Sequence, residues 1–103
     1  NVAGFIGATL VPGPSNNAIW KNKKVNIKSA NLRNTQIGAT LNNLDWADSI
    51  IAVIGKSKDS YEIFEVSTDW FKKEMGDSRL PYNKFVSCAK IRNYGTKIGE
   101  IPA

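Results

Sequence analysis

The clearest hydrophobic pattern in the chain is the unbroken apolar run SIIAVIG, residues 49 to 55. A short, β-branched run that ends in glycine is typical of a strand buried on both faces. A polar turn, KSKDS, follows and leads into the alternating segment YEIFEV at 61 to 66. Alternation directly after a tight polar turn predicts an antiparallel neighbour. These two segments form the predicted centre of a sheet.

A hairpin is predicted earlier in the chain. The segments AIW (18 to 20) and KVNIKSA (24 to 30) read as strands, and the intervening KNK suits a turn. The preceding VPGPSN is a rigid corner, because two prolines and a glycine disfavour regular structure. We expect the second hairpin strand to lie next to the buried strand at 49 to 54.

The faces of that second hairpin strand differ in character. Side chains alternate between the two faces of a strand, so Val25 and Ile27 share one face with Ser29. Asn26 and Lys28 therefore point together to the other face, away from the apolar pair.

Two helices are predicted with their ends. STDWFKKEMGD (67 to 77) has Ser67 or Thr68 as a cap, and Gly76 suits the terminating position. A shorter helix is expected over ATLNNLDWA (39 to 47). The segment KFVSCAKI fits a helix and a strand equally well, and YGTKIGE near the end of the chain reads as a turn.

These elements predict a single α/β (α+β) domain over residues 1 to 103. Its centre is a mixed sheet of about four or five strands with helices packed on it. The chain begins at Asn1 without an initiator methionine, so we expect a processed chain or a fragment. This leaves open that N-terminal elements of the domain are missing.

Composition closes several classes of chemistry. The chain has 42% hydrophobic and 22% charged residues, which is ordinary for a soluble globular protein. With no histidine, it cannot build a Ser-His-Asp triad, a Cys-His pair or a His-ligated zinc site. The single cysteine, Cys88, excludes an internal disulfide and fits a reducing, cytoplasmic compartment. No apolar run is long enough to cross a membrane.

The net charge of +5 is concentrated in one part of the chain. Residues 1 to 44 contain five basic side chains and no acid, whereas later acids and bases cancel. Such a cluster predicts a polyanion as partner, with nucleic acid the first candidate. The alternative is a solvated basic turn. The residues expected to contact phosphates are Lys21, Lys23, Lys24 and Arg33.

Three stretches carry a resemblance to a known family: GPSNNAIWKNKKVNIKSANLR, WADSIIAVIG and YEIFEVSTDWFKKE. Together they resemble the core of the PD-(D/E)xK nuclease superfamily, the fold of many type II restriction endonucleases. That family presents an acid at the start of one strand, then a hairpin, then acid-x-lysine on the next strand. A buried apolar strand and a strand-helix unit follow. The resemblance covers roughly residues 8 to 75.

The resemblance implies a site whose acids are replaced by amides. Asn17 stands at the first metal-binding acid, Asn26 at the second, and Lys28 at the family's lysine. The backbone carbonyl of Ile27 stands where the family has a further metal ligand. The implied cofactor is Mg²⁺, but hard cations need anionic oxygens, and two amides supply no charge. An Asn-x-Lys on an exposed strand face is also compatible with plain solvated surface.

Three functional hypotheses follow. The first is a restriction-endonuclease-like domain that binds duplex DNA and has impaired or lost phosphodiester hydrolysis. The second is a non-catalytic domain whose basic hairpin binds an acidic protein partner. The third is an active metal-dependent endonuclease with a relocated acid, Glu62 or Glu65. A homodimer is left open, and Trp20, beside the lysines, is the tryptophan to test for base stacking.

Overall fold

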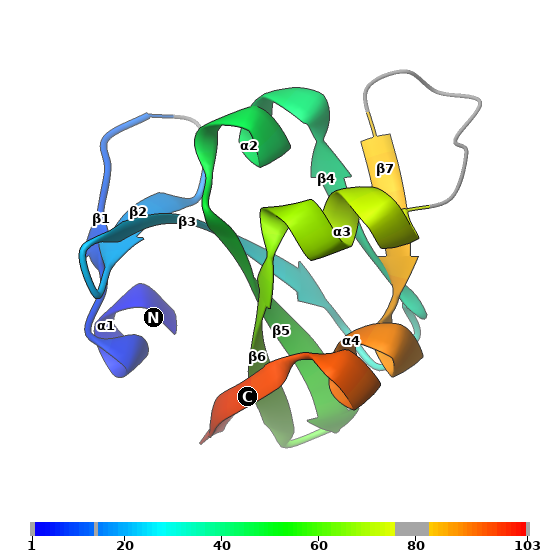
Figure 1. The fold of residues 1–103 in the computed structure, drawn as a ribbon. Helices are drawn as coiled ribbons and strands as arrows, with labels where there is room; N and C mark the ends of the chain where they lie inside the picture. Colours follow the sequence, from blue (N-terminus) through cyan, green and yellow to red (C-terminus); the bar gives the residue numbers. More distant parts are fainter. Residues whose placement is uncertain (1, 14, 76–82, 103) are drawn as a thin grey trace.

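Eight strands and four helices make up the described part of the chain, which comprises residues 2–13, 15–75 and 83–102 of the computed structural model (Figure 1). In chain order the elements are α1 (Val2–Ile6), β1 (Thr9–Leu10), β2 (Asn17–Trp20), β3 (Lys23–Ala30), β4 (Gln36–Thr40), α2 (Leu41–Trp46), β5 (Ser49–Ser57), β6 (Ser60–Ser67), α3 (Thr68–Glu74), β7 (Asn83–Ser87), α4 (Cys88–Tyr94) and β8 (Thr96–Pro102). Of the helices described, none has the length and apolar character needed to cross a membrane.

Six of these strands form one mixed sheet in the order β1-β2-β3-β5-β6-β8. The β3–β5 pair is parallel and all other pairs in this sheet are antiparallel. The chain passes from β3 to β5 through β4 and α2, because parallel neighbours need a crossover connection. The remaining two strands, β4 and β7, form a separate antiparallel pair. The predicted mixed α+β class is therefore confirmed, with more strands than the four or five expected.

The buried run at 49 to 55 is the central strand β5, as predicted, and it lies between β3 and β6. Its alternate side chains enter two different hydrophobic clusters. The helix-side cluster lies under α2, α3, α4 and the β4–β7 pair, and consists of Ala30, Ile37, Ala39, Leu44, Ile50, Ala52, Ile54, Phe64, Val66, Phe71, Val86, Cys88 and Ile91. The α1-side cluster consists of Ala3, Ala18, Trp20, Val25, Ile27, Ile51, Val53 and Ile63. Burial on both faces explains the unbroken apolar run.

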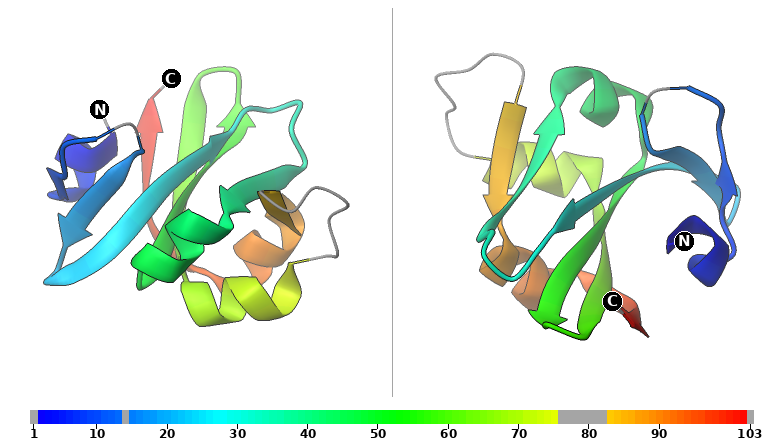
Figure 2. Two further views of the ribbon diagram at one scale, coloured as in Figure 1. Left: turned by 90° about the horizontal axis from the view of Figure 1, so that it is seen from above. Right: turned by 180° about the vertical axis from the view of Figure 1, so that it is seen from behind.

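The short helix α1 covers the second face of the sheet. It contacts both β1 and β8, which are the two edge strands of the six-stranded sheet. The sheet therefore curves around α1, which Figure 2 shows between the N-terminal strands and β8. Trp20 fixes the end of this helix, because its indole Nε1 donates a 2.9 Å hydrogen bond to the carbonyl of Ile6.

The two predicted helices are confirmed. α2 begins after Thr40, whose hydroxyl accepts from the backbone N–H of Asn43 while the Asn43 side chain bonds back to Thr40. This reciprocal capping satisfies donors that the first helical turn leaves free. α3 begins after Ser67, which accepts from the N–H of Trp70. The predicted terminator Gly76 lies outside the described residues.

The C-terminal part of the chain differs from the predictions. The segment KFVSCAKI, for which a helix and a strand were both considered, contains one of each. Strand β7 ends at Ser87, and the same residue caps helix α4. The turn predicted over YGTKIGE is wrong, since Thr96–Pro102 forms strand β8 against β6. β8 is an edge strand with mostly exposed side chains, so only Ile98 and Ile101 pack on the α1-side cluster. Two apolar positions are too few to signal a strand from the sequence.

Candidate functional site

The hairpin β2–β3 closes through a turn of two residues. Lys21 and Asn22 both have positive φ angles, 50° and 62°. Left-handed conformation at both central residues is the hairpin turn whose twist matches that of the flanking strands. The predicted hairpin is confirmed, and Lys23 belongs to the second strand rather than to the turn.

Asn17 and Asn26, which were predicted from the sequence as site residues, lie directly opposite each other. Asn17 pairs with Asn26 in the β2–β3 register, and Asn26 Nδ2 donates a 2.7 Å hydrogen bond to Asn17 Oδ1. Asn26 has 0% exposure, whereas Asn17 is partly exposed. Solvent therefore reaches this pair from the Asn17 side.

One acceptor of this pair is unsatisfied. Asn26 Oδ1 is buried and accepts no hydrogen bond from the described residues. Leaving a buried acceptor without a donor costs about 1–3 kcal/mol. The interpretation of Asn26 as solvated strand surface is wrong, because the residue is closed off from solvent. Such a group in a folded protein calls for a specific explanation, and a role in a site is one of them.

Lys28 lies two residues further along β3, on the same face as Asn26. It stands opposite Ala52, a member of the helix-side cluster, and is partly buried. Burial lowers the pKa of the Lys28 ammonium group, because desolvation disfavours the charged form. Within the described ranges no acid forms an ion pair with it. Its charge is thus free to meet an anion from outside.

The backbone of Ile27 faces the start of β2. Its N–H donates a 2.9 Å hydrogen bond to the carbonyl of Asn16. The N–H and C=O groups of one residue point to the same side of a strand, so the Ile27 carbonyl also faces this end of β2. The side chain of Ile27 is part of the α1-side cluster.

The two glutamates considered as relocated acids do not converge on this pair. Glu65 stands opposite Ile51 and so lies on the α1 side of the sheet, and it forms an ion pair with Lys23. Glu62 is level with Ile54 rather than with Asn26, and it pairs with Arg92 at 3.3 Å and Lys97 at 3.1 Å. Across residues 2–13, 15–75 and 83–102, no group of three or more metal-binding side chains gathers.

Sequence reasoning did not assign Asp48 to the site. Its carboxylate Oδ2 accepts a 3.0 Å hydrogen bond from the backbone N–H of Lys24, at the start of β3. Its own N–H donates to the Lys24 carbonyl at 2.8 Å. The exposed carboxylate of Asp48 therefore lies beside Lys24, which precedes Asn26 by two residues in β3. The sequence could have indicated Asp48, because it directly precedes the apolar run 49 to 55, which was predicted to lie next to the second hairpin strand.

The basic residues predicted to contact phosphates do not form one surface. Lys21 and Lys23 lie over the ring of Trp20, at 4.6 Å and 5.2 Å from its centroid. Lys24 lies 5.8 Å from the ring centroid of Trp46. Arg33 follows the opposite end of the eight-residue strand β3, about 25 Å away along its axis. The three lysines gather at the hairpin, and Arg33 does not join them.

Trp20 is a core residue rather than an exposed base-stacking platform. It is 6% exposed and its indole N–H is already bonded to Ile6. Its contribution near the lysines is to hold their ammonium groups by cation–π contact.

Fold and site together define a mixed α+β domain with a half-buried pair of asparagine side chains on the β2–β3 hairpin. Comparison with family models, with curated proteins and with solved structures finds no match for this chain.

Proposed function

We propose that this domain binds duplex DNA through the β2–β3 hairpin, and that Asn17, Asn26 and Lys28 form a nuclease-like centre that does not cleave. The observation that carries the proposal is the 2.7 Å hydrogen bond between the two asparagine side chains, in register on adjacent strands. The same two positions hold carboxylates in the family that the sequence resembles.

The chemistry of the pair accounts for binding without cleavage. A nuclease of this class uses Mg²⁺ to acidify the attacking water and to neutralise charge at the phosphate. Mg²⁺ binds through carboxylates, which the pair lacks. The two amides share one hydrogen bond, whereas two carboxylates at this distance repel. The pair therefore holds its shape without a metal and adds no negative charge to repel DNA.

Cations that lack an acidic partner supply the attraction. Lys21, Lys24 and Lys28 form no ion pair within the described residues, whereas Lys23 pairs with Glu65. Charges without an acidic partner are not neutralised within the described residues, and their contact with phosphate releases counterions from DNA.

The test restores the charge. Asn17→Asp with Asn26→Asp, and Asn17→Asp with Asn26→Glu, place two carboxylates on the face that holds Lys28. We expect Mg²⁺-dependent cleavage of duplex DNA by at least one double variant and none by the parent. Adding Lys28→Ala should remove the gain. A folded double variant that binds no Mg²⁺ by calorimetry would contradict the nuclease-like centre.

A second candidate function is binding of an acidic protein partner. Ile19 is 40% exposed and stands opposite Lys24, so an apolar and a cationic side chain share one face of the hairpin. Protein interfaces combine such groups, and their affinity depends less on salt than that of a DNA surface. Undetectable DNA binding at low salt by the parent chain would favour this candidate.

A further inference from the structure

A second, structurally separate groove lies at the far end of β3 from the hairpin. It consists of two adjacent cavities of about 500 Å³ and 320 Å³, which share Asn31 and Tyr61 as lining residues. The groove runs between the segment after β3 and the β5–β6 hairpin, with the last residues of β8 at one end. Volumes of this size are typical of small-molecule sites.

The larger cavity, here called the inner pocket, combines apolar surface with neutral hydrogen-bonding groups. Val53, Tyr61 and Ile101 supply apolar surface, and Ser29, Asn31 and Asn34 supply polar groups. None of the residues that line it is charged. Such a lining suits a flat, uncharged ring with donors and acceptors on its edge, because the ring faces bury apolar area while the edge is bonded.

The inner pocket is held in shape by its own backbone. Asn31 Oδ1 accepts from the N–H of Arg33 at 2.9 Å and from the N–H of Asn34 at 3.2 Å. Within the part of the chain that the structure describes, no acceptor bonds its Nδ2, which can therefore donate to a ligand. Gly55 lets this segment lie against β5, since a Cβ there would come within 2.7 Å of the Leu32 backbone nitrogen. The site is therefore largely formed before any ligand binds.

The smaller cavity, the outer pocket, carries positive charge that is not neutralised. Arg33 and Lys58 line it, and both side chains are exposed. Neither forms an ion pair with another described residue. The carboxylate of Asp59, in the same turn as Lys58, does not line the cavity.

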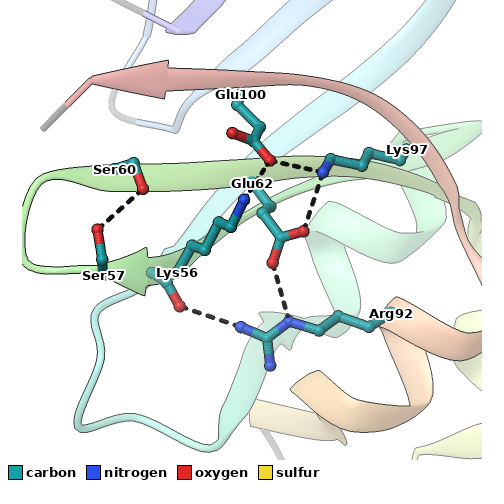
Figure 3. Close-up of polar contacts among 8 residues, drawn as sticks. Lys56, Ser57, Ser60, Glu62, Arg92, Lys97 and Glu100 are labelled. Carbon is teal, nitrogen blue, oxygen red and sulfur yellow. Dashed lines mark hydrogen bonds and ion pairs between the residues drawn. The ribbon is translucent and has the colours of Figure 1, made fainter.

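Neighbouring charges behave differently, as Figure 3 shows. Lys56 pairs with Glu100 at 2.8 Å, and Arg92 pairs with Glu62 at 3.3 Å. These acids neutralise the cations beside the groove and leave the positive charge of the groove to Arg33 and Lys58. An anion that enters the groove is thus attracted to its outer end.

We propose that the groove binds a nucleoside phosphate, with the base in the inner pocket against Tyr61 and the phosphate on Arg33 and Lys58. Aromatic side chains stack on every base, and asparagine amides bond base edges. Arginine binds phosphate through two parallel hydrogen bonds, and lysine adds a point charge. The ligand is either a free nucleotide or one residue of an unpaired strand. This site goes beyond the proposed DNA-binding hairpin and uses none of its residues.

The experiment is a titration of the ¹⁵N-labelled full chain, followed by amide chemical shifts. The probes are deoxyadenosine 5′-monophosphate, deoxyadenosine, inorganic phosphate and a single-stranded ten-residue oligodeoxythymidine. We expect the nucleotide to shift the amides of Asn31, Arg33, Lys58 and Tyr61, and to bind about tenfold tighter than either half alone. In a Lys21→Ala, Lys24→Ala background, which removes the hairpin cations, tighter binding of the oligonucleotide than of the nucleotide indicates an unpaired strand as the ligand, and equal or weaker binding indicates a free nucleotide.

Two variants and a control assign the halves of the site. Arg33→Ala with Lys58→Ala should weaken the nucleotide at least about tenfold and leave the nucleoside unchanged. Tyr61→Leu should weaken nucleotide and nucleoside about fivefold or more and leave phosphate unchanged. The control, Lys73→Ala, removes an exposed cation of α3 that lines neither pocket and should change none of these affinities. Equal affinity for phosphate and nucleotide, loss of nucleotide binding in the control, or no shifts at all would overturn the proposal.

Discussion

Asn26 Nδ2 donates a 2.7 Å hydrogen bond to Asn17 Oδ1. The amide oxygen of Asn26, Oδ1, accepts no hydrogen bond from the described residues. The two residues are exact partners in the β2–β3 register, but only Asn17 is reached by solvent. Charge introduced here is therefore placed in a site that is partly closed to water, where it has large effects on stability.

Replacing both asparagines by aspartate should make folding depend on metal. Without Mg²⁺, two adjacent carboxylates repel and one is buried, so we expect Asn17→Asp with Asn26→Asp to lose about 2–4 kcal/mol of unfolding free energy at pH 7. Mg²⁺ should recover much of this loss by binding the folded state. Chemical denaturation with EDTA or with Mg²⁺ measures both. Asn22→Asp, in the exposed turn, serves as a control that should respond to neither. A double variant as stable as the parent in EDTA would contradict the prediction.

Removing the charge of Lys28 should stabilise the domain and weaken its binding to DNA. Burial lowers the pKa of Lys28 below 10.5 in the folded state, so the charged form is penalised there. The penalty is fully present below the folded pKa and disappears as pH rises through the window up to 10.5. We therefore expect Lys28→Met to raise the Tm at pH 7 and to abolish the rise in parent stability within that window. Thermal denaturation from pH 7 to 11 measures this. A lower Tm for Lys28→Met would indicate an unrecognised structural partner.

The hairpin lysines should differ in their effect on salt dependence. Three cations without acidic partners predict a slope of log K against log salt of about −3 for duplex DNA. Lys21→Ala and Lys24→Ala should each reduce its magnitude by about one unit. Lys23→Ala should reduce it less, because Lys23 already pairs with Glu65. Fluorescence anisotropy at several salt concentrations measures the slopes. Arg33→Ala is the matched control for duplex DNA, and an equal effect at all four positions would refute a DNA surface confined to the hairpin.

The Glu100 cluster should give the domain a defined acid sensitivity. Hydrogen bonds from Lys56 and Lys97 lower the pKa of the Glu100 carboxyl to about 2. A folded pKa below the unfolded value contributes stability that is present above about 4.5 and lost as pH falls toward 2. We expect the Tm of the parent to fall more steeply across this window than that of Glu100→Gln. Parallel slopes for the two proteins would show that Glu100 has no part in acid unfolding.

The local features of the fold were predictable because their signals lie within a few neighbouring residues. The apolar run 49 to 55 indicates a doubly buried strand, since each of its side chains must leave water whichever face it takes. Ser67 indicates the start of α3 for a similar reason, because it bonds a backbone group only three residues away. The facing of Asn26 and Lys28 follows from the two-residue period of any strand.

Contacts between segments far apart in the sequence were decided only by the tertiary structure. Thr96–Pro102 forms strand β8 because it pairs with the edge of β6. The residues of this segment by themselves do not indicate that pairing. Glu65 and Asn26 fall on opposite faces only through the register of three strands, and the extended length of β3 separates Arg33 from the hairpin lysines. The burial of Asn26 likewise depends on what packs over it. The sequence by itself determined the hairpin strands that carry Asn17 and Asn26. The packing around these residues decided that their side chains bond each other and that Asn26 is closed to solvent. The physical reason is that hydrogen-bond partners and solvent access depend on contacts between residues far apart in the chain.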